Sequence, residues 1–179
     1  MEGDVTVPAK VQFLMHTAVE KCGLLYVLVH KVGEFQWRML AESGHEEWES
    51  IFRRKLMRVP YASKSVATAM RRQQLGRIIN LGAGGAERGF GQATISMNAA
   101  AKAAVVSLTR FLAIEKGNHA ITVNVVNSSN LDEKELTVIE ARWIRDARYP
   151  IGCGPTVEYM VAAITFCASK ETTTLPIRC

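Results

Sequence analysis

The stretch from Gly76 to Glu115 constrains the fold of this chain most strongly, because it combines three local patterns in a fixed order. An apolar run over Arg77–Leu81 predicts a short buried strand. A glycine-rich segment follows, and a helical pattern then runs over Thr94–Lys116, where Gly117-Asn118 predicts its end. A buried strand, a loop and a long helix in this order favour an α/β fold.

Helical and extended patterns alternate along the rest of the chain. The run LLYVLV within Leu24–His30 is typical of a parallel strand that is covered on both faces. We expect a further strand over Ile121–Val126, and no internal repeat or low-complexity linker divides the chain. We therefore expect one α/β domain over residues 1–179. The remaining predicted elements are helices over Pro8–Cys22, over Glu46–Gln73 with a bend near Pro60, over Glu135–Asp146 and over Pro155–Ala168.

Composition bears on location and on several classes of partner. The chain is 48% hydrophobic, with a net charge of +5. We find neither a signal-peptide pattern nor an apolar run as long as a membrane span, so we expect a cytoplasmic protein without a membrane partner. The four cysteines form no Cys-x-x-Cys pair and the four histidines lack ligand spacing, which predicts reduced thiols and no metal site. The basic cluster Arg53-Arg54-Lys55 with Arg58 lacks a recognition motif and is expected to be a solvated face, so we expect no nucleic-acid partner.

The stretch from Gly76 to Glu115 resembles the catalytic core of the short-chain dehydrogenase/reductase family. In that family a strand and a serine loop precede a long helix that carries Tyr-x-x-x-Lys and then a Leu-Thr-Arg run. Leu108-Thr109-Arg110 sets the register of the resemblance. It places the family lysine on Lys102 and the family tyrosine on Asn98, and the resemblance extends over about residues 4 to 172.

The resemblance implies that most of the catalytic positions have changed. The family tyrosine is the general acid/base, and the lysine lowers its pKa and holds the nicotinamide ribose. Asn98 cannot give or take a proton near neutral pH. The family serine falls on Ala83, which has no hydroxyl, and the family asparagine that orders a water falls on Lys55. Of the four catalytic positions, only Lys102 matches.

The features with which the family binds its dinucleotide are also missing. The family opens with a strand and a Thr-Gly-x-x-x-Gly-x-Gly turn at a helix N-terminus, which holds the pyrophosphate. Here the match begins at Asp4-Val5-Thr6, which resembles the end of the third family strand. The glycines from Gly82 onward do not replace that turn, because Glu87 stands where the third glycine is needed. The resemblance therefore implies a truncated Rossmann-like fold, a three-layer α/β/α arrangement with a reduced parallel sheet and without the first mononucleotide-binding half, and no cofactor bound by this chain.

An incomplete sheet argues for a partner chain. The strand over Leu24–His30 is expected to have one open edge, and a long apolar edge strand promotes association unless something covers it. The helix over Thr94–Lys116 has an apolar face of Ala101, Ala104, Val105, Leu108 and Leu112, which suits the sheet. The opposite face is expected to contact a partner, although the preceding helix of the same chain is an alternative. That interface face consists of Ala99, Ala103, Val106 and Arg110.

These features predict a catalytically inactive subunit that stabilises or regulates an active short-chain dehydrogenase/reductase homologue. The expected assembly is a hetero-oligomer, most simply a heterotetramer, with NAD(P) bound in the active partner. This pattern is similar to heteromeric hydroxyacyl-CoA dehydrogenases with one degenerate subunit. Two alternatives remain open. One is a reductase completed by a cofactor-binding partner chain, and the other is a free-standing ligand-binding or regulatory module that uses the cleft around Gly82, Asn98 and Ser128.

Overall fold

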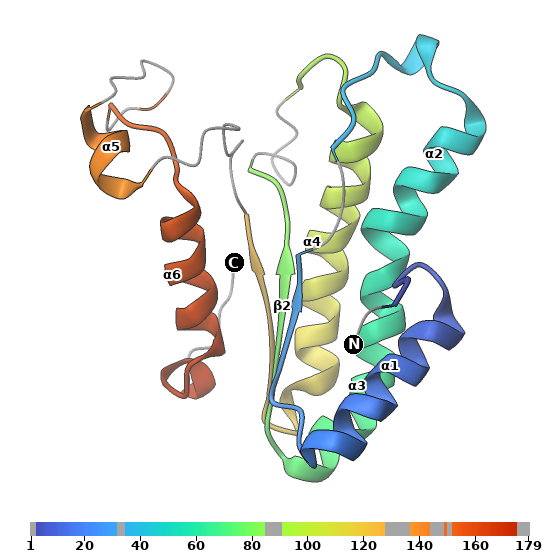
Figure 1. The fold of residues 1–179 in the computed structure, drawn as a ribbon, viewed down its shortest axis with the longest axis vertical. Coiled ribbons are helices and arrows are strands. Elements are labelled where there is room, and N and C mark those ends of the chain that lie inside the picture. The colour runs from blue at the N-terminus through green and yellow to red at the C-terminus, as the bar shows by residue number, and fades with distance from the viewer. Residues whose placement is uncertain are drawn as a thin grey trace.

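The computed structural model describes residues 3–31, 35–84, 91–127, 137–143, 149 and 152–174. The strands of these residues form one parallel sheet in the order β1-β2-β3, with bounds Val27–His30, Gly76–Leu81 and Ile121–Val126. Figure 1 shows α1, α3 and α4 on one side of this sheet and α6 on the other. The expected parallel sheet between two helical layers is therefore confirmed. The helices are α1 (Pro8–Cys22), α2 (His45–Phe52), α3 (Arg58–Gln73), α4 (Ser96–Gly117), α5 (Val138–Trp143) and α6 (Val157–Ala168), with short helical turns η1 (Leu40–Glu42), η2 (Arg53–Met57) and η4 (Glu171–Thr174).

The hydrophobic core lies between the sheet and the pair α3 and α4. Every residue of the central strand β2 is buried, as expected for a strand with neighbours on both edges and helices on both faces. On α4, Ala101, Val105 and Leu112 are buried, which confirms that the predicted apolar face packs on the sheet. The main core cluster consists of Val66, Met70, Ile78, Leu112, Ile121 and Val123.

The long helical region before β2 is interrupted one turn earlier than its proline. Residues Arg53–Met57 form a π-helix, and α3 begins directly afterwards at Arg58. Pro60 has no backbone N–H and its ring crowds the carbonyl one turn back, so the wider turn before it accommodates both defects. This local change turns Lys55 and Arg58 inward, and each is only 3% exposed. The expectation of a solvated basic face is therefore wrong for these two residues.

Strand β1 is shorter than the apolar run that predicted it. It begins at Val27 because the backbone of Leu25 is held by Gln73 of α3. The Gln73 side chain accepts a hydrogen bond from Leu25 N (3.0 Å) and donates one to Leu25 O (3.1 Å). Tyr26, Val27 and Val29 are 46%, 42% and 39% exposed along this edge of the described sheet. The edge strand thus carries apolar side chains that no described element covers.

Helix α4 differs from its prediction in two respects. By length and composition alone it is long and apolar enough to cross a membrane, so the expectation that no segment qualifies is wrong. It packs on β2 and β3, as the core helix of a globular domain does. On the predicted partner face, Val106 is buried against this chain, Ala99 and Ala103 are half-buried and Arg110 is exposed. The larger exposed apolar side chains are Phe111 and Ile114, and the partner interface itself stays a prediction.

Candidate functional site

The candidate site lies at the carboxyl ends of β1 and β2, which is where open α/β sheets bind their ligands. His30 ends β1 and pairs in register with Asn80, the residue before Leu81 at the end of β2. Helix α4 passes the same ends, and Lys102 Nζ donates a hydrogen bond to Leu81 O at 2.5 Å. The structure thus brings the predicted lysine to the strand ends, and Ala83 follows β2 by two residues.

Lys102 is the titratable group that the resemblance aligned with the family lysine. It is half-buried, and its pKa is lowered from 10.5 to about 8. Burial is the largest cause, followed by the positive charges of Lys55 and Arg58. Removing an ammonium from water and surrounding it with like charges both disfavour its protonated form. A lysine in this state can release a proton much closer to neutral pH than an ordinary lysine.

Asn98 precedes Lys102 by one helical turn and is 2% exposed. Its amide Nδ2 donates to Gln36 O at 2.5 Å, and Arg38 N donates to Thr94 O nearby. These two hydrogen bonds connect the segment around Gln36 and Arg38, which follows β1, to the start of α4. Asn98 therefore has a positioning role in the structure, and its place at the family tyrosine position stays a prediction from the resemblance.

Two further basic residues at the site were missed as site residues by the sequence interpretation. Arg58 is buried at the start of α3, and its Nε has no hydrogen-bond partner among the described residues. His30 is 7% exposed, and burial and then the charge of Arg58 lower its pKa from 6.5 to about 4. Lys55, at the family asparagine position, lies with Nζ 5.2 Å from the Phe35 ring centroid, within cation–π range. Lys55 lies on the π-helix before Pro60 and Arg58 directly follows it, and the sequence carried no signal for this π-helix beyond the proline.

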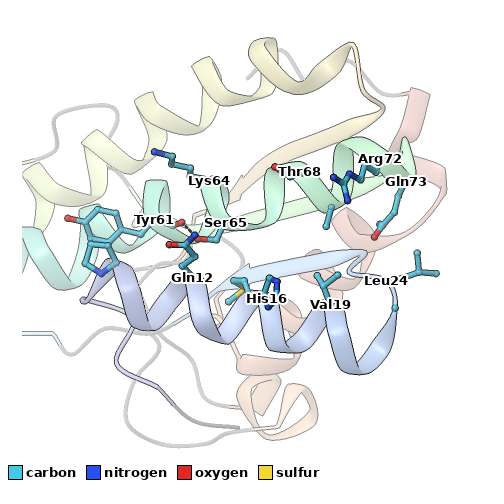
Figure 2. A pocket seen from close by; sticks show the side chains of 14 residues that line it. Gln12, His16, Val19, Leu24, Tyr61, Lys64, Ser65, Thr68, Arg72 and Gln73 are labelled. Carbon is cyan, nitrogen blue, oxygen red and sulfur yellow. Dashed lines mark hydrogen bonds between the residues drawn. The ribbon is translucent and has the colours of Figure 1, made fainter.

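A separate cavity of ≈ 1000 Å³ lies between α1 and α3, away from the strand ends. Figure 2 shows α1 side chains such as Gln12 and His16 on one wall and α3 side chains such as Tyr61 and Arg72 on the other. Neither Asn98 nor Lys102 lines it. The predicted cleft around Gly82 therefore does not coincide with this cavity, and Ser128 lies outside the described residues. Within the described ranges, no group of three or more His, Cys, Asp or Glu residues is arranged to hold a metal ion.

Comparison with known proteins identifies the family. The model of a family described as enoyl-(acyl carrier protein) reductase matches residues 1–175. The 3-oxoacyl-[acyl-carrier-protein] reductase FabG of Salmonella typhimurium is 31% identical over 176 residues, which are 94% of this chain and 69% of FabG. The short-chain reductase protein NovJ of Streptomyces niveus is 38% identical over 69% of this chain and 46% of NovJ. A solved structure from Bacillus thuringiensis superposes with a TM-score of 0.85 and 30% identity, covering 98% of this chain and 72% of that one.

The chain belongs to the short-chain dehydrogenase/reductase family, with its Rossmann-like α/β fold. The relatives that match most of it are named reductases, which points to an enzyme. This finding overturns the expectation of a catalytically inactive subunit. That expectation assumed that losing the tyrosine and serine hydroxyls removes proton transfer, but the structure holds another titratable group, Lys102, at the strand ends.

Proposed function

We propose that this chain is a carbonyl-reducing oxidoreductase that works with NAD(P), and that Lys102 donates the proton to the substrate oxygen. The observation that carries the proposal is the half-buried Lys102 ammonium at the end of β2, with a pKa of about 8. The membership of the family supports the reductase class and an expected cytoplasmic location. The name of FabG suggests a 3-oxoacyl thioester as the substrate class.

Reduction of a carbonyl requires a hydride at carbon and a proton at oxygen, and NAD(P)H supplies the hydride when it is bound. Lys102 is protonated at neutral pH and is still acidic enough to protonate a developing alkoxide, because its pKa lies near the working pH. The hydrogen bond to Leu81 O fixes its direction. The Asn98 amide stays bonded to Gln36 O and holds the neighbouring loop.

The residues present fit the nicotinamide end of a dinucleotide. By the resemblance, Lys102 corresponds to the family lysine that holds the ribose. We also propose that a homologous chain packs against this chain in a hetero-oligomer. The uncovered apolar edge at Tyr26, Val27 and Val29 supports this, because an edge strand of this kind pairs readily with another chain.

Co-expression with a homologue from the same source tests the proposal. The co-purified complex is assayed for NADPH oxidation with 3-oxoacyl thioesters, and NADPH binding is measured separately by calorimetry. Lys102→Met is expected to lower kcat by about 10²- to 10⁴-fold, the usual contribution of a general acid. Lys21→Met, on the exposed end of α1, is the matched control and should keep full activity. Unchanged turnover in Lys102→Met, or a complex that neither forms nor binds NADPH, would refute it.

A further inference from the structure

Arg58 carries a buried charge to which the proposed reaction assigns no role. Its side chain is 97% buried, since only 3% is exposed, and its Nε lacks a hydrogen-bond partner. No carboxylate of the described residues forms an ion pair with it. Glu47 forms its salt bridge with Arg38, whose Nη1 lies 3.2 Å from Oε2 of Glu47. Arg58 therefore carries a full positive charge in the protein interior without a described counterion.

Three titratable side chains around Arg58 are basic as well. His30 lies at the end of β1, and its buried Nε2 also has no hydrogen-bond partner. Lys102 reaches the same strand ends from α4, and Lys55 of η2 lies close enough for its charge to lower the pKa of Lys102. Arg58 contributes a repulsive charge to both His30 and Lys102. One histidine and three cationic side chains thus converge from four elements.

An unpaired buried charge costs several kcal/mol, and a guanidinium does not lose its proton to avoid that cost. An oxyanion provides the missing charge and accepts the hydrogen bonds that Nε of Arg58 and the neutral imidazole of His30, with its proton on Nε2, leave unused. The fork of Arg58 suits a carboxylate or phosphate group, which accepts two parallel hydrogen bonds. The place is also suitable, because ligands of α/β sheets bind at the carboxyl ends of the strands.

We propose that Arg58, His30 and Lys102 form an anion site that takes a compact oxyanion, a carboxylate or phosphate group carried by the substrate or the cofactor. Its role in catalysis rests on the proposed function, whereas its existence does not. An oxyanion held there would lie beside the proton donor and would fix the orientation of the reacting carbonyl.

Thermal unfolding of the full chain tests the site without any turnover assay. Unfolding is followed at pH 7 in a chloride buffer, and sodium phosphate or sodium acetate replaces sodium chloride at constant ionic strength. We expect a saturable stabilisation, with the Tm rising by about 3–5 °C for each tenfold increase in anion above its Kd. Greater potency of acetate points to a substrate carboxylate, and greater potency of phosphate points to a phosphate group.

Variants separate a specific site from general screening. Arg53→Met removes the same charge from an exposed position of η2 and should keep the anion response. Arg58→Met should abolish it and should be at least as stable as wild type in chloride alone, because it removes an unpaired buried charge. A wild-type protein that ignores both anions, together with an Arg58→Met variant that is destabilised in chloride, would show that the protein neutralises Arg58 internally and would overturn the proposal.

A second measurement needs no Arg58 variant. The ring resonances of His30 are followed by NMR while inorganic phosphate is added to wild type, with His16 on the exposed face of α1 as the internal reference. A saturable shift confined to His30 supports the site, and the absence of such a shift contradicts it. Failure of both measurements alongside Lys102-dependent turnover would remove the anion site and leave the proposed function standing.

Discussion

Acid is expected to destabilise this protein through His30, the residue that ends β1. His30 is 7% exposed, and its pKa is lowered from 6.5 to about 4, first by burial and then by the charge of Arg58. Because the folded-state pKa lies below the unfolded-state value, the unfolded chain binds the additional proton between pH 6.5 and 4. The free energy of unfolding should therefore fall as the pH drops through this window.

The magnitude follows from the two pKa values. A difference between 6.5 and about 4, at about 1.4 kcal/mol per pH unit, gives a loss on the order of 3 kcal/mol below pH 4. Above pH 6.5 the histidine is neutral in both states, so it contributes no pH dependence there. For a domain of this size the full effect corresponds to a Tm decrease of roughly 6–12 °C.

Urea denaturation at several pH values between 7 and 4 measures this effect. Wild type is compared with His30→Asn, which cannot be charged, and with His16→Asn on the exposed face of α1. Carboxylates titrate in all three proteins, so the difference between wild type and His30→Asn isolates the histidine. As the pH is lowered from 7 to 4, the free energy of unfolding of His30→Asn should rise by about 3 kcal/mol relative to that of wild type. A difference that stays constant from pH 7 to pH 4, or an NMR titration of His30 with a pKa near 6.5, would refute the reasoning.

Three further predictions concern the site and the core. Reduction by the complex should slow as the pH rises through about 8, because only protonated Lys102 donates a proton, and a flat pH–rate profile from 7 to 9.5 would contradict this. Thr109→Val removes the hydroxyl that accepts from the buried Nδ2 of Asn80 at 2.8 Å, and urea denaturation should show a loss of about 1–3 kcal/mol that Thr109→Ser largely avoids. Equal losses in both variants would show that packing, not the hydrogen bond, is responsible. In Gly76→Ala a new Cβ would lie 2.6 Å from Sδ of the fully buried Met70, so we expect a loss of about 1–3 kcal/mol, which should shrink in a Met70→Val background.

Local patterns in the sequence predicted most of the elements. Helix α1 and strand β3 have the predicted bounds, because a helix start at Pro8 and an apolar strand pattern over Ile121–Val126 are both local signals. The predicted helix over Glu135–Asp146 is described only as α5, and residues 135–136 and 144–146 lie outside the described residues. The strand over Leu24–His30 was predicted too long. The side chain that displaces its first residues, Gln73, is distant in sequence, so no local pattern reports it.

The site was predicted only in part for the same reason. Spacing along one helix placed Asn98 and Lys102 in register, since positions four residues apart share a helix face. The burial of Lys55 and Arg58 depends on how the helix accommodates Pro60, and η2, which carries Lys55, packs against α4. The prediction of a solvated basic cluster failed for Lys55 and Arg58 because composition does not show which side of a helix is covered.

The sequence by itself determined the α/β architecture, the parallel sheet and the position of Lys102 one turn after Asn98, because hydrophobic periodicity and residue spacing are properties of the chain order. Only the tertiary structure decided that Lys102, Arg58 and His30 meet at the ends of β1 and β2. Their altered pKa values arise from burial and from charges close in space but up to 47 residues apart in the chain, between Lys55 and Lys102. The proposed proton transfer and anion binding depend on that proximity, which folding alone creates.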